Sequence, residues 1–347
     1  MRRHFKQIIC LILCLVTAFS FSGFFIASAV SIKDGKDALE AQWKRGAGPE
    51  VDTYSIDYSY YSPVKKSSDK TKYPLVVLIG GASQGSYQGK EIKANEFTNW
   101  SSSEYQSRFA ESKGAYILIA RSPEEKDKYW SNTEIYPAFK AALDDFVKKN
   151  SNVDTDRIYI GGWCLGGSGA QRMASRYSDF FAGVIIMAPF HTISLDQIDD
   201  LRNMAVWVIG CKADVASNYA ICIGSFWERL KATSTDLSRI RLTTFDTAPE
   251  ASPYANHNVW LQASYDMHYT GSGYTGMQTI DGMGKKISNP YMISWLSSYS
   301  KSNAVNCTCQ CHSLNMITRL VWQITNVIYR ILGVGSKQYC GCGKAHW

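Results

Sequence analysis

One cysteine occupies a position suited to a reactive nucleophile. Residues 162–166 read Gly-Trp-Cys-Leu-Gly, so a residue without a side chain lies two positions before and two positions after Cys164. A nucleophile held in a sharp turn between a strand and a helix needs such neighbours, because the backbone leaves little room there. A nearby imidazole can convert the thiol to a nucleophilic thiolate. The pattern predicts covalent attack by Cys164 on a carbonyl, the alternative being a glycine-rich turn around a packed thiol.

The residues around this turn show the periodicities of alternating strands and helices. Residues 157–160 (Arg-Ile-Tyr-Ile) predict a buried strand, and residues 171–176 predict a helix after the turn. An edge strand is expected at 53–62 and the last strand at 238–245. Other apolar runs predict core strands at 74–79, 115–120, 183–188 and 204–210 and an amphipathic helix at 136–149. This alternation indicates a parallel sheet in an α/β layer architecture.

These residues resemble the α/β-hydrolase superfamily. Gly-Trp-Cys-Leu-Gly-Gly at 162–167 is similar to the nucleophile turn of dienelactone hydrolases, which also carry cysteine. The flanking segments 156–162 and 182–189 look closer to secreted esterases and prolyl-oligopeptidase-like hydrolases. The resemblance covers roughly residues 50 to 300 and implies the α/β-hydrolase fold, with a mostly parallel central sheet flanked by helices.

The resemblance also implies the partners of Cys164. Asp214 follows the run at 204–210, where the superfamily places the acid of its catalytic triad, although an aspartate there could instead cap a helix. His257 lies in the loop after the expected last strand and is followed after two residues by Trp260, as is common for the superfamily's catalytic histidine. The order nucleophile, acid, histidine is that of the superfamily.

An oxyanion hole is implied by the same resemblance. One donor would be the backbone N–H of Leu165, directly after the nucleophile, and the other that of Ala82 or Gly81 after the first core strand. Relatives have histidine where this chain has Gly80, which leaves the choice between Ala82 and Gly81 open. No cofactor is needed for this chemistry.

The charge is concentrated at the two ends of the chain. Of the net charge of +7, residues 1–29 carry three positive charges and residues 303–347 carry four, so the middle of the chain is neutral. A neutral domain lacks the basic surface that nucleic-acid binding requires. Apolar residues make up 45% and charged residues 19%, which indicates a globular protein.

The chain divides into three segments. Residues 1–29 have a basic start, an apolar run and Ala-Ser-Ala at 27–29, which predicts a cleaved signal peptide and a secreted or cell-surface protein; an uncleaved membrane anchor is the alternative. Residues 30–302 would form the hydrolase domain. Residues 303–347 would form a tail around an amphipathic helix that could contact a membrane surface, the cell envelope or another copy.

Cysteine and histidine are concentrated in this tail. They permit either a structural zinc site or disulfides, and the candidate ligands are Cys307, Cys309, Cys311, His312, Cys340, Cys342 and His346. In the main domain, Cys211 and Cys222 could pair or remain core thiols.

The expected function is hydrolysis of carboxylic esters through a Cys-His-Asp triad and an acyl-thioester. The substrate would be a small-molecule or polysaccharide ester, such as an acyl group on a polysaccharide. A peptidase of the same fold and a catalytically impaired binding module are the alternatives.

Overall fold

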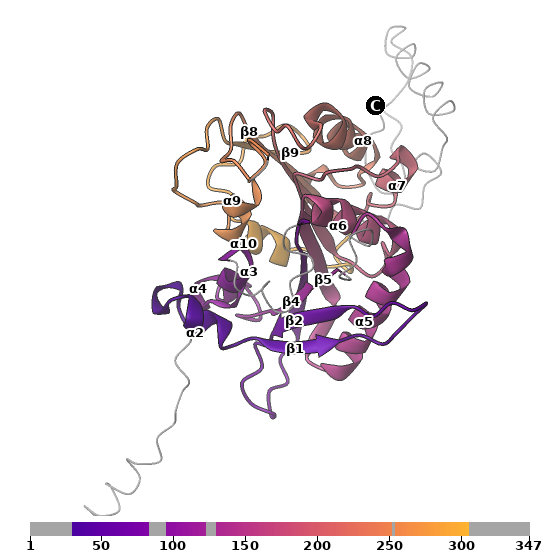
Figure 1. The fold of residues 1–347 in the computed structure, drawn as a ribbon, viewed down its shortest axis with the longest axis vertical. Coiled ribbons are helices and arrows are strands. Elements are labelled where there is room, and N and C mark those ends of the chain that lie inside the picture. Colours follow the sequence, from indigo (N-terminus) through magenta and orange to yellow (C-terminus); the bar gives the residue numbers. More distant parts are fainter. Residues whose placement is uncertain (1–29, 83–94, 123–129, 252–253, 305–347) are drawn as a thin grey trace, which may run out of the picture. The chain divides into compact units, whose positions relative to one another are not determined.

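A computed structural model describes residues 30–82, 95–122, 130–251 and 254–304. Within these ranges the strands form a nine-stranded sheet in the order β1-β2-β4-β3-β5-β6-β7-β8-β9 (Figure 1). The strands are β1 (Lys44–Ala47), β2 (Asp57–Tyr61), β3 (Tyr73–Ile79), β4 (Tyr116–Ala120), β5 (Val153–Trp163), β6 (Gly183–Met187), β7 (Ala205–Cys211), β8 (Ile240–Phe245) and β9 (Gln278–Asp281).

The middle of the sheet is parallel. Strands β4, β3, β5, β6, β7 and β8 pair in parallel, while β1, β2 and β9 pair with their neighbours in antiparallel fashion. Carboxyl ends of parallel strands meet at one edge of a sheet. The loops that follow β3, β5, β7 and β8 therefore share an edge, and these loops contain the residues that the sequence singled out.

Helices cover both faces of the sheet (Figure 1). One apolar core lies under α5 (Tyr136–Lys149), α6 (Leu165–Arg176), α7 (Leu195–Asp199) and α8 (Phe226–Thr233). The other lies under α3 (Asn95–Thr98), α4 (Ser103–Gln106), α9 (Trp260–Ser264) and α10 (Met292–Ser297), with α2 (Lys36–Glu40) at the same side. Successive strand residues face opposite sides. Accordingly, Val77 joins the first core and Val76 the second, which explains the unbroken apolar runs of the central strands.

The structure confirms the expected fold class. Strands β3, β4, β6 and β7 lie within one or two residues of their expected positions, β5 extends beyond the expected 157–160 at both ends, and α5 has the expected bounds of 136 and 149. The nucleophile turn is flanked by β5 and α6, as its pattern predicted.

The expectations for the sheet edges were wrong. The segment expected as an edge strand, β2, lies between β1 and β4, and the true edge is β1, whose exposed sequence Lys-Arg-Gly-Ala carries no apolar alternation. The strand expected to be last, β8, is covered by β9. Both missed strands are four residues long, and such short edges depend on pairing with a neighbour rather than on their own sequence.

Hydrogen bonds hold the Ser/Asn-rich segment after α10 against the rest of the domain. The backbone N–H of Ser302 donates to Asp156 Oδ1 over 2.9 Å, and that of Lys301 donates to the Asp156 carbonyl over 3.0 Å. Nη1 of Arg239 donates to Asn303 Oδ1 over 2.8 Å. Serine and asparagine favour such local hydrogen-bonded turns as readily as flexible linkers.

The expected signal segment 1–29 and the tail from residue 305 lie outside the described residues. Among the helices that the structure describes, none combines the length and apolar character needed to cross a membrane.

Candidate active site

Cys164 lies in a strained turn between β5 and α6. Its φ of 56° and ψ of −125° are rarely adopted by a residue with a side chain. A Cβ added to Gly162 would lie less than 3.0 Å from the Gly166 carbonyl, and one added to Gly166 less than 3.0 Å from the carbonyls of Ile79 and Gly80. The two glycines are therefore required by close backbone approach, which holds the half-buried Cys164 at the carboxyl edge of the sheet.

Asp214 and His257 meet at the same edge, from the loops after β7 and β8. His257 Nδ1 lies 2.7 Å from Asp214 Oδ2, and both side chains are 2% exposed. The other oxygen, Oδ1, accepts the backbone N–H groups of Ala216 over 2.8 Å and Ser217 over 3.1 Å. The helix that follows is capped by Asn218 instead. Asp214 thus bonds the histidine with one oxygen and closes its own turn with the other.

The surroundings of His257 favour its protonated form. Burial by itself lowers the pKa, but the hydrogen bond to Asp214, together with the charges of Asp214 and the nearby Cys164, raises the pKa of His257 to about 9. Among the described residues, Nε2 is buried without a conventional hydrogen-bond partner. Because Nδ1 is held by Asp214, Nε2 is the nitrogen available to the Cys164 thiol. The structure therefore brings together the three residues from separate loops.

We expect the imidazole of His257 to titrate near pH 9 rather than near 6.5. Below the midpoint the imidazolium is attracted to Asp214, and this stabilisation of the folded state is lost as the pH rises through about 9. ¹⁵N NMR of the histidine-labelled protein from pH 6 to 10 would measure the midpoint, with His257→Gln assigning the signal. Asp214→Asn should shift the midpoint downward; an unchanged midpoint in this variant would contradict the assignment of Asp214 as the main raising partner.

Backbone donors lie next to Cys164. The N–H groups in the first turn of α6, beginning with Leu165, have no partner within the helix, and the positive end of the helix dipole lies there. Gly81 is close by, because a Cβ on it would lie 3.0 Å from the Cβ of Cys164. Ala82 follows as an exposed residue. The roles of Leu165 and Ala82 in an oxyanion hole stay predictions, with Gly81 as the other choice for the second donor.

Aromatic rings surround the histidine, and sequence reasoning missed their arrangement. Trp163 stacks on Trp260 with centroids 5.9 Å apart, and Trp260 packs edge-on against His257 at 5.2 Å. Tyr254 packs against His257 at 5.8 Å and against Phe190 at 6.4 Å. Tyr254 is 38% exposed and Phe190 is half-buried. Tyr254, three positions before His257, is the sequence feature that could have predicted an aromatic side chain at this site.

Two further histidines contact other aromatic rings. His191 packs edge-on against Phe190, and His268 stacks on Tyr291. Cys211 and Cys222 are separate free thiols, each with a pKa raised by burial, so the pairing alternative does not hold.

Within the described ranges, no group of three or more His, Cys, Asp and Glu side chains is placed to hold a metal ion. All seven predicted ligands of the tail fall outside those ranges.

This chain is similar to several proteins of known structure. No family model matches the sequence, and no curated protein matches it either. A thermostable esterase of known structure is similar to 76% of this chain, with a TM-score of 0.57 and 17% identity, and the match spans 64% of that esterase's length. An acylaminoacyl peptidase from Pyrococcus horikoshii (TM-score 0.46, 16% identity, 59% of this chain and 37% of that one) and a ferulic acid esterase (0.43, 15%, 58% and 89%) are also similar.

The similarity to the thermostable esterase, over 76% of this chain, is one of fold. The parallel strands, the helices on both faces and the strained turn after β5 agree with this similarity. The chain adopts the α/β-hydrolase fold.

Proposed function

We propose that this protein hydrolyses carboxylic esters with Cys164 as the nucleophile, His257 as the general base and acid, and Asp214 as the residue that orients the histidine. The observation that carries the proposal is the buried His257, whose Nδ1 is held by Asp214 while Nε2 lacks a conventional partner and the nearby Cys164 contributes to its raised pKa. An imidazolium beside the thiol favours the thiolate, the reactive form of cysteine.

The reaction follows from these contacts. The Cys164 thiolate attacks the carbonyl carbon of the ester, and the electron pair of the C=O bond moves to oxygen. Backbone N–H groups of Leu165 and of Ala82 or Gly81 stabilise the oxyanion. As the tetrahedral intermediate collapses, the C–O bond to the leaving group breaks and the imidazolium of His257 gives its proton to the departing alcohol.

Water completes the cycle. His257, now neutral, takes a proton from a water molecule as this attacks the carbonyl of the acyl-thioester. Collapse of the second tetrahedral intermediate releases the carboxylic acid, which loses its proton to water, and restores the thiolate beside the imidazolium. Asp214 keeps Nδ1 protonated throughout, so that Nε2 is the nitrogen that transfers the proton.

The aromatic side chains at the site support an ester attached to a ring-bearing molecule. Tyr254 lies beside His257 and Phe190 packs against Tyr254, and their apolar faces suit a sugar ring or an aromatic acyl group. We therefore propose acyl groups on polysaccharides as the substrate class. Export, which rests on the sequence of residues 1–29, would bring the protein to such polymers.

Selective alkylation joined to an activity assay tests the proposal. The full chain should hydrolyse p-nitrophenyl acetate, and iodoacetamide should abolish turnover in step with alkylation of Cys164, located by peptide mapping. Cys211 and Cys222 are buried and serve as internal controls that should react more slowly. Absence of turnover together with an unreactive Cys164 would leave only a binding role. Faster cleavage of peptide p-nitroanilides than of esters would instead identify a peptidase.

A further inference from the structure

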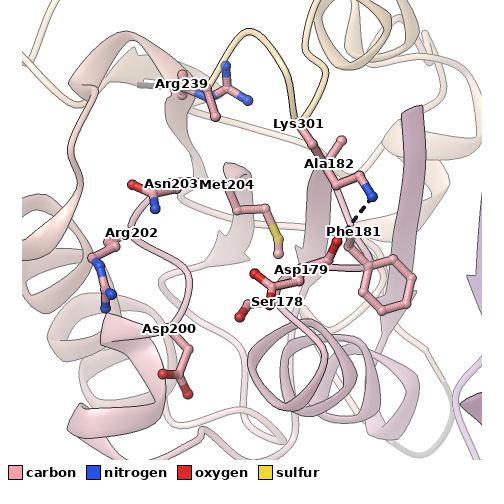
Figure 2. A pocket seen from close by; sticks show the side chains of 11 residues that line it. Ser178, Asp179, Phe181, Ala182, Asp200, Arg202, Asn203, Met204, Arg239 and Lys301 are labelled. Carbon is pink, nitrogen blue, oxygen red and sulfur yellow. Dashed lines mark hydrogen bonds between the residues drawn. The ribbon is translucent and has the colours of Figure 1, made fainter. Parts of the chain in front are cut away.

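A cavity lies at the edge of the sheet away from Cys164. Its volume is about 400 Å³, within the range of roughly 300 to 1,000 Å³ that small-molecule sites occupy. Figure 2 shows the side chains around it. The lining residues come from four segments: Ser178 to Ala182, Asp200 to Met204, Arg239, and Lys301 with Ala304.

The sheet topology separates this cavity from the candidate active site. Phe181 and Ala182 precede β6, Met204 precedes β7, and Arg239 precedes β8, so the cavity is built at the amino ends of three adjacent parallel strands. Cys164 follows the carboxyl end of β5. The two sites therefore lie at opposite edges of one sheet.

Three cations line the cavity, and their hydrogen bonds in the described part of the chain go to neutral oxygens. Arg202 Nη1 donates to the carbonyl of Asp199 over 3.1 Å. The guanidinium of Arg239 donates to the carbonyl of Ser300 and to both oxygens of Asn303. Lys301 Nζ donates to the carbonyl of Asp179 over 3.1 Å, as the dashed line in Figure 2 marks.

Arg239 is the least exposed of these cations. It is 3% exposed, its ring-stacking partner is Tyr299, and its Nε is buried without a hydrogen-bond partner among the described residues. Burial lowers the pKa of Arg239, and Tyr299, Asp236 and Tyr159 offset this only in part. The Nε of Arg202 is buried and unpartnered in the same way. A buried guanidinium N–H without a hydrogen-bond partner is costly, and a bound anion that accepts from it would relieve that cost.

The remaining lining residues narrow the chemistry of the anion. The exposed carboxylates of Asp179 and Asp200 also line the cavity, beside the three cations. Asp200 already accepts a hydrogen bond from Ser175 over 2.8 Å. Phe181 and Met204 supply an apolar wall. A singly charged molecule with a hydrocarbon part suits this lining better than a polyanion, which the two aspartates would repel.

We propose that the cavity between the amino ends of β6, β7 and β8 is a binding site for a small organic monocarboxylate. The carboxylate lies against Arg202, Arg239 and Lys301, and the hydrocarbon part lies against Phe181 and Met204. Because Arg239 and Lys301 also hold residues 300–303 in place, occupancy strengthens the docking of that segment. This site is independent of the proposed ester hydrolysis.

Binding is tested with sodium butyrate, added to the full chain against sodium chloride of equal ionic strength. Isothermal titration calorimetry gives Kd, and amide hydrogen exchange of residues 300–303 reports where the ligand acts. We expect saturable binding of butyrate and slower exchange at 300–303. The Kd should increase at least tenfold in Arg202→Gln and in Lys301→Gln, neither of which removes a fully buried side chain. Arg45→Gln, an exposed arginine of β1, is the matched control and should leave the Kd unchanged.

Each opposite result rejects the proposal. Butyrate that fails to saturate, or that binds equally in all variants, would show that the cavity is not the site. Inorganic phosphate that binds at least tenfold more tightly than butyrate would show that the charge argument selects the wrong anion. No hydrolysis is measured in any arm, so these results are separate from the outcome of the ester assay.

Discussion

Replacing Cys164 by alanine is expected to reduce kcat for p-nitrophenyl acetate by about 10⁴-fold or more, the order seen when a hydrolase loses its nucleophile. The methyl group cannot form the acyl-enzyme, while the backbone donors and His257 stay in place. Stopped-flow or steady-state absorbance at saturating ester measures the loss. Circular dichroism should be unchanged, because the strained backbone at this position is held by Gly162 and Gly166 rather than by the thiol.

Cys164→Ser is the matched variant. A hydroxyl restores a nucleophile at the same atom position but is far less acidic than a thiol, so it depends on His257 to remove its proton. Its kcat should lie between those of the wild-type protein and Cys164→Ala. An alanine variant as fast as the wild type would assign turnover to another group and overturn the role of Cys164.

Replacing Gly166 by alanine is expected to destabilise the fold by more than about 4 kcal/mol, a loss reserved for severe clashes in a core. The new Cβ would lie less than 3.0 Å from the backbone carbonyls of Ile79 and Gly80, and neither carbonyl can rotate away without disturbing the end of β3. Urea unfolding followed by tryptophan fluorescence measures the change, and failure to recover soluble protein would be its extreme form.

Gly224→Ala is the control for this substitution. Gly224 also lies in a helical segment, η5 (Tyr219–Ser225), but the nearest atom to an added Cβ is the Tyr219 carbonyl at an ordinary 3.6 Å. Its free energy of unfolding should change by no more than about 1 kcal/mol, since alanine favours helical backbone. Equal losses in the two variants would mean that the close packing of the nucleophile turn is not what requires Gly166.

The sequence predicted those parts of the molecule that depend on local pattern. The apolar run at 74–79 is buried at every position and the periodic stretch at 136–149 along one face, so each segment determines its own element. Strands β1 and β9 were missed because they are short, largely polar and defined by pairing with a neighbour.

The candidate active site also has one part that local sequence predicts and another part that it does not. Glycine spacing identified the turn at Cys164 from sequence alone, whereas Asp214 and His257 were identified through resemblance, since 43 residues separate them along the chain. The positions of Tyr254 and Arg239 depend on how distant loops meet at the two edges of the sheet. No local sequence pattern predicts how distant loops pack together. The aromatic surroundings of His257 and the cavity at the amino ends of β6, β7 and β8 could therefore be identified only from the structure.

Both carboxylate oxygens of Asp214 accept hydrogen bonds, and this limits which side chains can replace it. Each carboxylate oxygen accepts from a fixed donor: two backbone N–H groups on one side and the imidazole on the other. Asparagine has the same shape but only one accepting atom. If its oxygen faces the backbone, its amide N–H₂ faces Nδ1 and forces the hydrogen of a neutral imidazole onto Nε2, where it blocks proton uptake from Cys164. If the amide is flipped, its N–H₂ group faces the backbone N–H groups of Ala216 and Ser217, so that donors face donors and no hydrogen bond forms. Shape alone therefore does not make a substitute conservative here, because the position selects for an acceptor on both sides.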